Sequence, residues 1–117
     1  MKRVEAIIRP ANLDKVIDAL HQIGVTGLTV YEGQGMGDER PPAICYRGTS
    51  RPQKWIQRVK LEVLIDEDLS DAVIGAIYQY AYTGEVGDGR ILITTIDEVI
   101  RIRTGQCEPP RVDASAR

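Results

Sequence analysis

The sequence predicts an α+β sandwich in which a four-stranded antiparallel sheet carries two helices on one face. Apolar and amphipathic segments follow one another in the order β-α-β-β-α-β, and the two halves of this order are nearly equal in length. This order describes a ferredoxin-like βαββαβ fold. The chain has 117 residues, 43% of them hydrophobic and 27% charged, so a single domain over residues 1–117 is expected.

The first half of the chain is expected to form a strand, a helix and a second strand. Residues 4–8 are a short apolar strand, and Pro10 suits the helix start that follows, for which Asn12 is a good N-cap. The helix has one apolar stripe and stops at Gly24, and residues 25–32 alternate as the second strand. The stripe, expected in the core, consists of Leu13, Val16, Ile17, Leu20 and Ile23.

The second half repeats this order. Residues 58–65 alternate as the third strand, and acidic residues 66–68 favour the exposed N–H groups at the start of the second helix. The helix is expected to end at residues 83–84, before the β-branched residues 91–96, which predict a buried fourth strand. The buried face of the helix is expected to contain Leu69, Val73, Ala76, Ile77 and Tyr80.

The predicted sheet needs cover on both faces. Two helices protect only one face, and the strand residues Leu28, Val30, Val63 and Ile65 are too apolar to face water. Subunits are therefore expected to pack sheet to sheet in a homo-oligomer.

Composition and charge exclude several classes of protein. A net charge of −2 and a pI of about 5.4 do not suit a nucleic-acid coat, and the absence of Phe, with a single Trp, leaves little material for base stacking. Residues 1–10 lack the apolar segment of a secretion signal, and no apolar run approaches the ~18 residues of a membrane span. We expect a cytoplasmic protein without nucleic-acid binding or membrane insertion.

Cysteine and histidine offer little for catalysis or metal binding. Cys45 and Cys107 lie far apart without the spacing of a redox or zinc site, so they are expected to be reduced thiols without a role. His21 is the only histidine and lies near the end of a predicted helix, which favours a surface position.

A glycine-rich loop before the fourth strand predicts a cradle for polyphosphate. Gly87 and Gly89 flank Asp88, and glycine allows backbone N–H groups to approach an anion closely. Arg90 follows at once and supplies positive charge. The same Gly-Asp-Gly sequence is also a common hairpin turn, and that alternative stays open.

Two further arginines are expected to reach the same phosphates. Residues 99–103 alternate as an extended segment, which would place Arg101 and Arg103 on one side, about 7 Å apart. Parallel guanidinium groups suit phosphate, although arginines on alternate positions of an edge strand are often only a solvated face.

Residues 33–57 form a segment of about 25 residues between the halves, longer than compact domains usually contain without a functional reason. Glycines at its start allow hinge motion, and its prolines favour extended backbone. Ile44, Tyr46 and Trp55 are apolar groups among charges and suit burial in a partner. A passive, protease-sensitive loop is the alternative.

Five motifs make the chain resemble the PII signal-transduction proteins: MKRVEAIIRP, VTGLTVYEGQGMG, YRG, TGEVGDGRI and EVIRIRTG. The resemblance covers residues 1–106 without a gap. It implies a ferredoxin-like homotrimer with a nucleotide cleft between each pair of subunits, and a long T-loop, about 37–55, that reports the bound ligand to a target protein. Residues 106–117 would be a flexible tail.

The resemblance also implies which residues bind ATP or ADP. Residues 87–90 would wrap the phosphates, arginines of the neighbouring subunit would reach them, strand residues would surround the adenine, and the base of the T-loop would close the cleft. The residues concerned are Thr29, Gly35, Met36, Gly37, Asp38, Glu62, Leu64, Gly87, Asp88, Gly89, Arg90, Arg101 and Arg103.

Two departures from the family pattern concern the effector 2-oxoglutarate. Glu39 replaces the glutamine that coordinates Mg²⁺, and Arg58 replaces the lysine that binds the oxoacid. A carboxylate at position 39 could still hold Mg²⁺. It would repel a dicarboxylate on the same metal, since like charges at about 4 Å cost on the order of 1 to 4 kcal/mol. Tight 2-oxoglutarate sensing is therefore not expected.

The tip of the T-loop also departs from the family pattern. Arg51 replaces the tyrosine that is uridylylated in some members, and Thr49, with Ser50 beside it, takes the place of a serine that others phosphorylate. The target, a membrane transporter or a metabolic enzyme, need not be the family's ammonium channel. The residues expected to contact it are Ile44, Tyr46, Arg47, Thr49, Ser50 and Arg51.

Three classes of function remain. A regulator that senses adenine nucleotides fits the phosphate loop, the long loop and the scarcity of catalytic residues, and no enzymatic activity is expected. A weak ATP-hydrolysing protein would have to use Asp88 and Glu39. A trimeric metal-binding scaffold would have Cys45, Glu39 and Asp38 as its candidate ligands.

Overall fold

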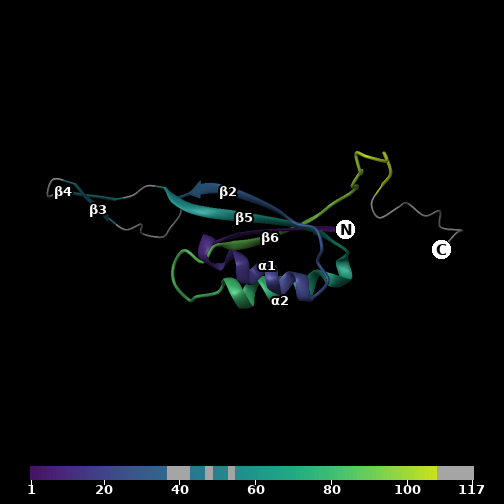
Figure 1. Cartoon of the computed structure of the whole chain (residues 1–117), viewed down its shortest axis with the longest axis horizontal. Coiled ribbons are helices and arrows are strands. Elements are labelled where there is room, and N and C mark those ends of the chain that lie inside the picture. The colour runs from purple at the N-terminus through teal and green to yellow at the C-terminus, as the bar shows by residue number, and fades with distance from the viewer. Residues whose placement is uncertain (37–42, 47–48, 53–54, 108–117) are drawn as a thin grey trace, which may run out of the picture.

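The computed structural model describes residues 1–36 and 55–107 in full, and the backbone of residues 43–46 and 49–52. One sheet of four antiparallel strands, in the order β2-β5-β1-β6, carries both helices on one face, as Figure 1 shows. This is the predicted ferredoxin-like arrangement. The elements are β1 (Lys2–Ile8), the 3-10 turn η1 (Pro10–Asn12), α1 (Leu13–Gln22), β2 (Thr29–Gly35), β3 (Ala43–Tyr46), β4 (Thr49–Pro52), β5 (Ile56–Ile65), the 3-10 turn η2 (Glu67–Leu69), α2 (Ser70–Ala81) and β6 (Arg90–Thr95).

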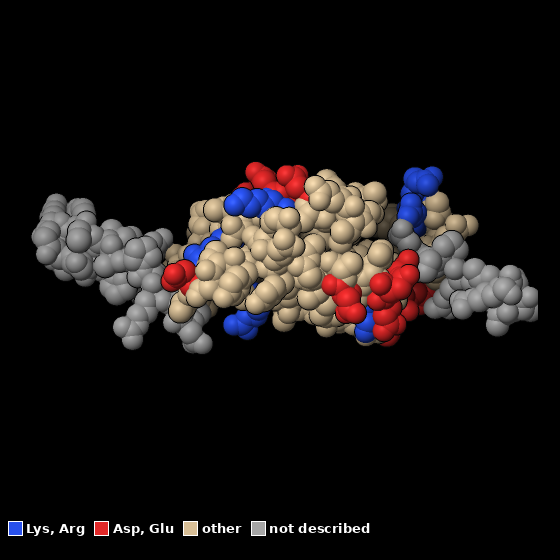
Figure 2. All heavy atoms as spheres, turned by 90° about the horizontal axis from the view of Figure 1, so that it is seen from below, with Lys and Arg blue, Asp and Glu red and all other residues tan. Residues whose placement is uncertain are grey.

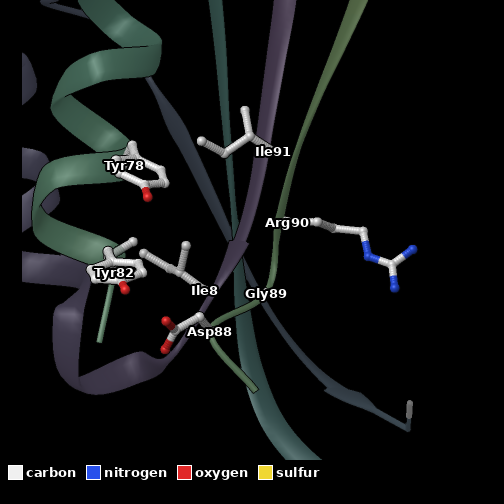
Figure 3. A pocket seen from close by; sticks show the side chains of 8 residues that line it. Ile8, Tyr78, Tyr82, Asp88, Gly89, Arg90 and Ile91 are labelled. Carbon is white, nitrogen blue, oxygen red and sulfur yellow. The ribbon is translucent and has the colours of Figure 1, made fainter. Parts of the chain in front are cut away.

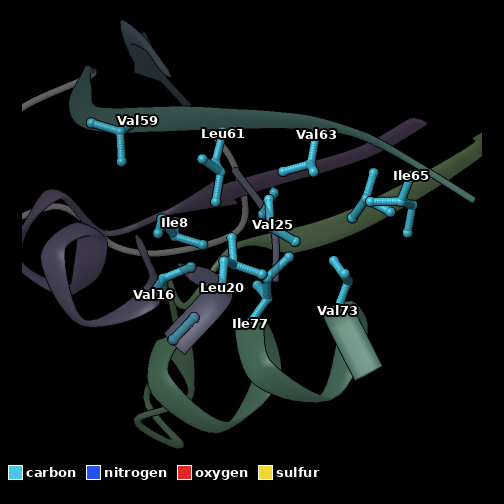
Figure 4. Close-up of a cluster of buried hydrophobic side chains, with 13 residues drawn as sticks. Ile8, Val16, Leu20, Val25, Val59, Leu61, Val63, Ile65, Val73 and Ile77 are labelled. Atoms are coloured by element: carbon cyan, nitrogen blue, oxygen red, sulfur yellow. The ribbon is translucent and has the colours of Figure 1, made fainter. Parts of the chain in front are cut away.

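The core lies between the sheet and the two helices (Figure 4). Alternate residues of β1 and β5 point toward the helices, because successive side chains of a strand lie on opposite faces. Each large apolar side chain buried in this way contributes about 1.5 to 3 kcal/mol relative to leaving it in water. The largest side chains that are essentially inaccessible are Val4, Ile8, Val16, Leu20, Leu61, Val63, Val73 and Ile77.

The four apolar residues from which we predicted sheet-to-sheet packing of subunits do not lie on the open face of the sheet. Val63 and Ile65 are buried against the helices of the same chain, and Leu28 and Val30 pack against that core. The register pairs Glu5 with Glu62 on the opposite face of the sheet, which is therefore partly charged. A homotrimer stays a prediction that these apolar residues do not support.

Two strands differ from their predicted form. β2 begins at Thr29 rather than at residue 25, because Gly24 takes φ 99° and Val25 is buried within the connection from α1. The prediction that the fourth strand is buried was wrong: β6 is an edge strand paired only with β1, and Leu92 and Ile93 are 42% and 47% exposed. Position in the sheet, rather than composition, decides burial here.

The helices also differ in detail. Asn12 precedes α1 as predicted but makes no side-chain cap, because the turn η1 gives it helical backbone angles, and its amide donates to the Ala81 carbonyl at 3.4 Å. Val73 and Ile77 of α2 are buried as expected, whereas the expected core residues Leu69, which lies in η2, and Tyr80 are more than one-third exposed. None of the helices in the described part of the chain is long and apolar enough to cross a membrane.

The long segment between β2 and β5 contains a short hairpin. β3 pairs antiparallel with β4, from Ala43 opposite Pro52 to Tyr46 opposite Thr49. The predicted extended backbone is confirmed for these eight residues, four in each strand. The side chains expected to contact a target, from Ile44 to Arg51, lie outside the described residues.

Candidate functional site

The glycine loop, residues 82–89, lies beside the end of β1. It joins α2 to β6, and β6 runs antiparallel to β1 with Arg90 opposite Ile7. Gly87 and Gly89 take φ 103° and 95°, a region that other residues rarely adopt. A Cβ at Gly89 would lie 1.7 Å from the Ile7 carbonyl oxygen. Glycine is therefore required at both positions by its backbone angle, and at Gly89 also by the close contact with β1.

Asp88 lies inside this loop and binds its backbone. Its Oδ2 accepts from the Thr83 and Gly84 amides at 2.8 and 2.9 Å, and its Oδ1 accepts from the Thr83 hydroxyl. The Thr83 hydroxyl is the largest cause that holds the pKa of Asp88 far below its usual range; the two amides and Arg9 add to it, and burial opposes them. The carboxylate is therefore charged near neutral pH.

Arg9 contacts two parts of the loop and was missed as a site residue by sequence reasoning. Its Nε lies 3.2 Å from Asp88 Oδ1, and its Nη2 donates to the Val86 carbonyl at 2.8 Å. Arg9 and Asp88 are 79 positions apart. The sequence carries no local signal for this pair, because only the pairing of β1 with β6 brings the two together.

Arg90 is exposed and leaves the loop in a different direction from Asp88. Figure 3 shows its guanidinium directed away from a hollow of about 320 Å³ that Tyr78, Tyr82 and Ile91 help to line. The rings of Tyr78 and Tyr82 stack there with centroids 5.4 Å apart. In the strand register Arg90 lies opposite Ile7, on the face of the sheet that the helices leave open.

Arg101 and Arg103 are not on one side of an extended segment, and that prediction was wrong. Both are exposed, in a tight turn that an isolated bridge between Ile100 and Cys107 closes. The Arg101 amide donates to the Gln106 carbonyl at 2.9 Å, and its carbonyl accepts from a downstream amide at 2.7 Å. These local hydrogen bonds replace the extended backbone that the alternating sequence suggested.

This turn and the glycine loop lie at opposite ends of the sheet (Figure 1). Arg90 begins β6 opposite Ile7, and Thr95 ends it opposite Lys2. Thr95 lies five positions after Arg90 along the strand, which corresponds to about 17 Å. Within one chain the structure does not bring Arg90 together with Arg101 or Arg103.

The residues expected around adenine form a third group. Thr29 of β2 lies opposite Glu62 of β5, and both line a hollow of about 530 Å³ together with Leu64. In the register Thr29 pairs with Glu62, Glu62 with Glu5, and Glu5 with Leu92 on β6, so Thr29 lies three strand spacings from β6, about 14 Å, and Glu62 two spacings, about 10 Å.

A further hollow of about 340 Å³ lies at the base of the T-loop. Gly35 and Arg58 line it, and the Arg58 Cγ lies 3.5 Å from where a Cβ on Gly35 would be. Lys60 lies over the ring of Tyr31, 4.7 Å from its centroid, a contact that sequence reasoning missed. Met36 is exposed. The remaining predicted residues of this group, Gly37, Asp38 and Glu39, lie outside the described residues.

The described residues offer little for metal chemistry. Among residues 1–36 and 55–107, no three His, Cys, Asp or Glu side chains gather as a metal site would require. The Cys107 thiol donates to Glu98 at 3.0 Å. The expected scaffold ligands Asp38, Glu39 and Cys45 lie outside the side chains that the structure describes.

Charge is distributed without a dominant sign. On the face shown in Figure 2, basic and acidic side chains occur together, and no continuous basic surface is seen among the described residues of that face. Nucleic acid needs such a surface for phosphate contacts.

The family model for nitrogen regulatory protein P-II matches residues 1–106, the same span that carries the glycine loop, the T-loop and the arginine turn. The chain belongs to the P-II family. It is 44% identical over 106 residues to the nitrogen regulatory protein P-II of Azospirillum brasilense, covering 91% of this chain and 95% of that protein. The corresponding proteins of Rhodospirillum rubrum and Synechocystis sp. are 45% and 44% identical, with the same coverage.

Proposed function

We propose that this P-II protein binds ATP or ADP between subunits and uses the bound nucleotide to control a target protein through its T-loop. The geometry of the glycine loop is the observation that supports this proposal. Gly87 and Gly89 allow its backbone to take positive φ, the loop lies against the end of β1, and the exposed Arg90 follows it directly. Such a loop presents N–H groups and positive charge together, which suits phosphate.

The positions of the arginines support a site shared between subunits. Arg101 and Arg103 lie at the opposite end of the sheet from Arg90, so one chain cannot place all three around one polyphosphate. A neighbouring copy can, if its arginine turn lies against the glycine loop. Thr29, Glu62 and Leu64 line a separate hollow that could receive adenine in the same shared arrangement.

A regulator, rather than an enzyme, fits these residues best. Hydrolysis needs a positioned base or water-orienting group. Asp88 was the candidate among the described residues, and its two oxygens already accept hydrogen bonds from Thr83, Gly84 and Arg9. Glu39 could hold Mg²⁺ beside the phosphates, and its charge should make the response to 2-oxoglutarate weak. A cytoplasmic homotrimer that docks on a transporter or a metabolic enzyme remains part of the proposal.

Subunit mixing tests the shared site directly. Arg90→Ala and Arg103→Ala each remove a charge-assisted contact to phosphate, so each should weaken ATP binding by about 1.5 to 3 kcal/mol, roughly 10- to 150-fold. When the two variants are unfolded together and refolded as mixed trimers, about a quarter of the interfaces should carry both wild-type arginines. Calorimetry should then recover about a quarter of the high-affinity sites.

The outcomes separate the alternatives. A site inside one chain would recover nothing on mixing, because no chain carries both arginines. Unchanged affinity in folded Arg103→Ala would remove the arginine turn from the site. Each variant refolded alone serves as the control, and light scattering coupled to chromatography measures the number of subunits.

A further inference from the structure

Arg9 lies outside the glycine loop, and its side chain hydrogen-bonds two residues of that loop. It follows β1 directly, and its Nε and Nη2 engage the Asp88 carboxylate at 3.2 Å and the Val86 carbonyl at 2.8 Å. One guanidinium therefore ties a backbone group and a side chain of the loop to the end of the central strand β1. The Arg9 side chain is only 31% exposed.

Asp88 presents an apparent conflict with anion binding. A carboxylate within a phosphate loop should repel the ligand. Its two oxygens accept from four donors: the amides of Thr83 and Gly84, the Thr83 hydroxyl and Arg9 Nε. A carboxylate has about four lone-pair sites, so this one is saturated. The Asp88 charge is thereby compensated within the protein.

We propose that Arg9 and Asp88 are positioning residues. They hold the glycine loop in the shape that receives a nucleotide polyphosphate, and they do not contact the polyphosphate themselves. This inference rests on the proposed nucleotide binding. Asp88 acts as an internal anion for the Thr83 and Gly84 amides, and phosphate is left to the part of the loop around Gly87, Gly89 and Arg90. Arg9 neutralises the internal anion and holds it in place.

The shape of the arginine side chain is essential to this role. Arg9 reaches two acceptors at once because the guanidinium carries its donors in a rigid planar fork. Lysine keeps the charge but concentrates it at one point, so it cannot reproduce both contacts with the same geometry. If Arg9 acted only through its positive charge, Arg9→Lys would bind ATP like the wild type.

Calorimetry with ATP and AMP distinguishes positioning from general damage. We expect Arg9→Ala to weaken ATP binding by about tenfold, the equivalent of one lost charge-assisted hydrogen bond, and AMP binding by less than about threefold, because AMP lacks the outer phosphates. Arg9→Lys should bind ATP about as weakly as Arg9→Ala. Lys15→Ala, which removes one positive charge from an exposed position of α1, is the matched control and should bind like the wild type.

Amide hydrogen exchange at Thr83 and Gly84 provides a second measurement that does not need a nucleotide. Both amides donate to Asp88, so Arg9→Ala should speed their exchange severalfold while β1 and β5 exchange as in the wild type. Unchanged exchange at both amides would overturn the inference. So would full recovery of ATP affinity in Arg9→Lys, or equal losses for ATP and AMP.

The proposed nucleotide binding and the positioning role of Arg9 can be refuted separately. If the wild-type protein binds no ATP, the proposed function is refuted, and the exchange measurement alone decides whether Arg9 orders the loop. If the wild type binds ATP and Arg9→Ala binds it equally well, the function stands and the positioning role is refuted.

Discussion

Gly89→Ala tests the contact between the glycine loop and β1. The new Cβ would lie 1.7 Å from the Ile7 carbonyl oxygen, and contacts below 3.0 Å essentially do not occur, so loop and strand must separate by at least 3.0 minus 1.7, or 1.3 Å. The oxygen belongs to the central strand β1 and has little freedom to move. Strain at positive φ costs about 1 to 3 kcal/mol and overpacking a similar amount, so we expect a destabilisation of about 2 to 4 kcal/mol.

Urea unfolding at fixed protein concentration measures this loss, because the stability of an oligomer depends on concentration. Gly27→Ala is the matched control: no atom lies within 4 Å of its added Cβ and its φ is not positive, so its stability should change by less than about 0.5 kcal/mol. Gly89→Ala should also lower the affinity for ATP, because the loop is displaced. A variant with wild-type stability and wild-type ATP affinity would refute the close approach of the loop to β1.

Four further predictions follow from the structure and the sequence. Gly75→Ala should raise the free energy of unfolding by about 0.5 to 1 kcal/mol in urea, since Gly75 is an exposed residue of α2 with open space at its Cβ. Because the pKa of Asp88 is lowered in the folded protein, its charge stabilises the fold at pH values above the usual aspartate pKa, and this stabilisation is lost as the pH falls below that value. Asp88→Asn should therefore make the free energy of unfolding less dependent on pH below about pH 4. An unchanged pH dependence would contradict the hydrogen bonds to Asp88. Adding 2-oxoglutarate to the MgATP complex should change little, and Glu39→Gln should increase the response in calorimetry. Deleting residues 42–53 should leave the ATP affinity within about tenfold of the wild type and abolish capture of a target protein from an extract. If the target is still captured, it docks on another part of the protein.

The sequence was sufficient for the parts of the fold that depend on local pattern. Helical spacing placed α1 and its buried Val16 and Leu20, and strand alternation placed β5 with Val63 and Ile65 on one face. Glycines that need positive φ were also recognisable, because the residue type itself reports the backbone requirement.

Only the tertiary structure decided what depends on strand order and on contacts between distant residues. The apolar residues of β6 suggested a buried strand, and its place at the edge of the sheet exposes Leu92 and Ile93. The alternating arginines suggested an extended segment, but local hydrogen bonds fold this segment into a turn. The bond between Arg9 and Asp88 joins residues 79 positions apart, so it exists only because β1 pairs with β6, and periodicity within one element carries no information about such a pairing.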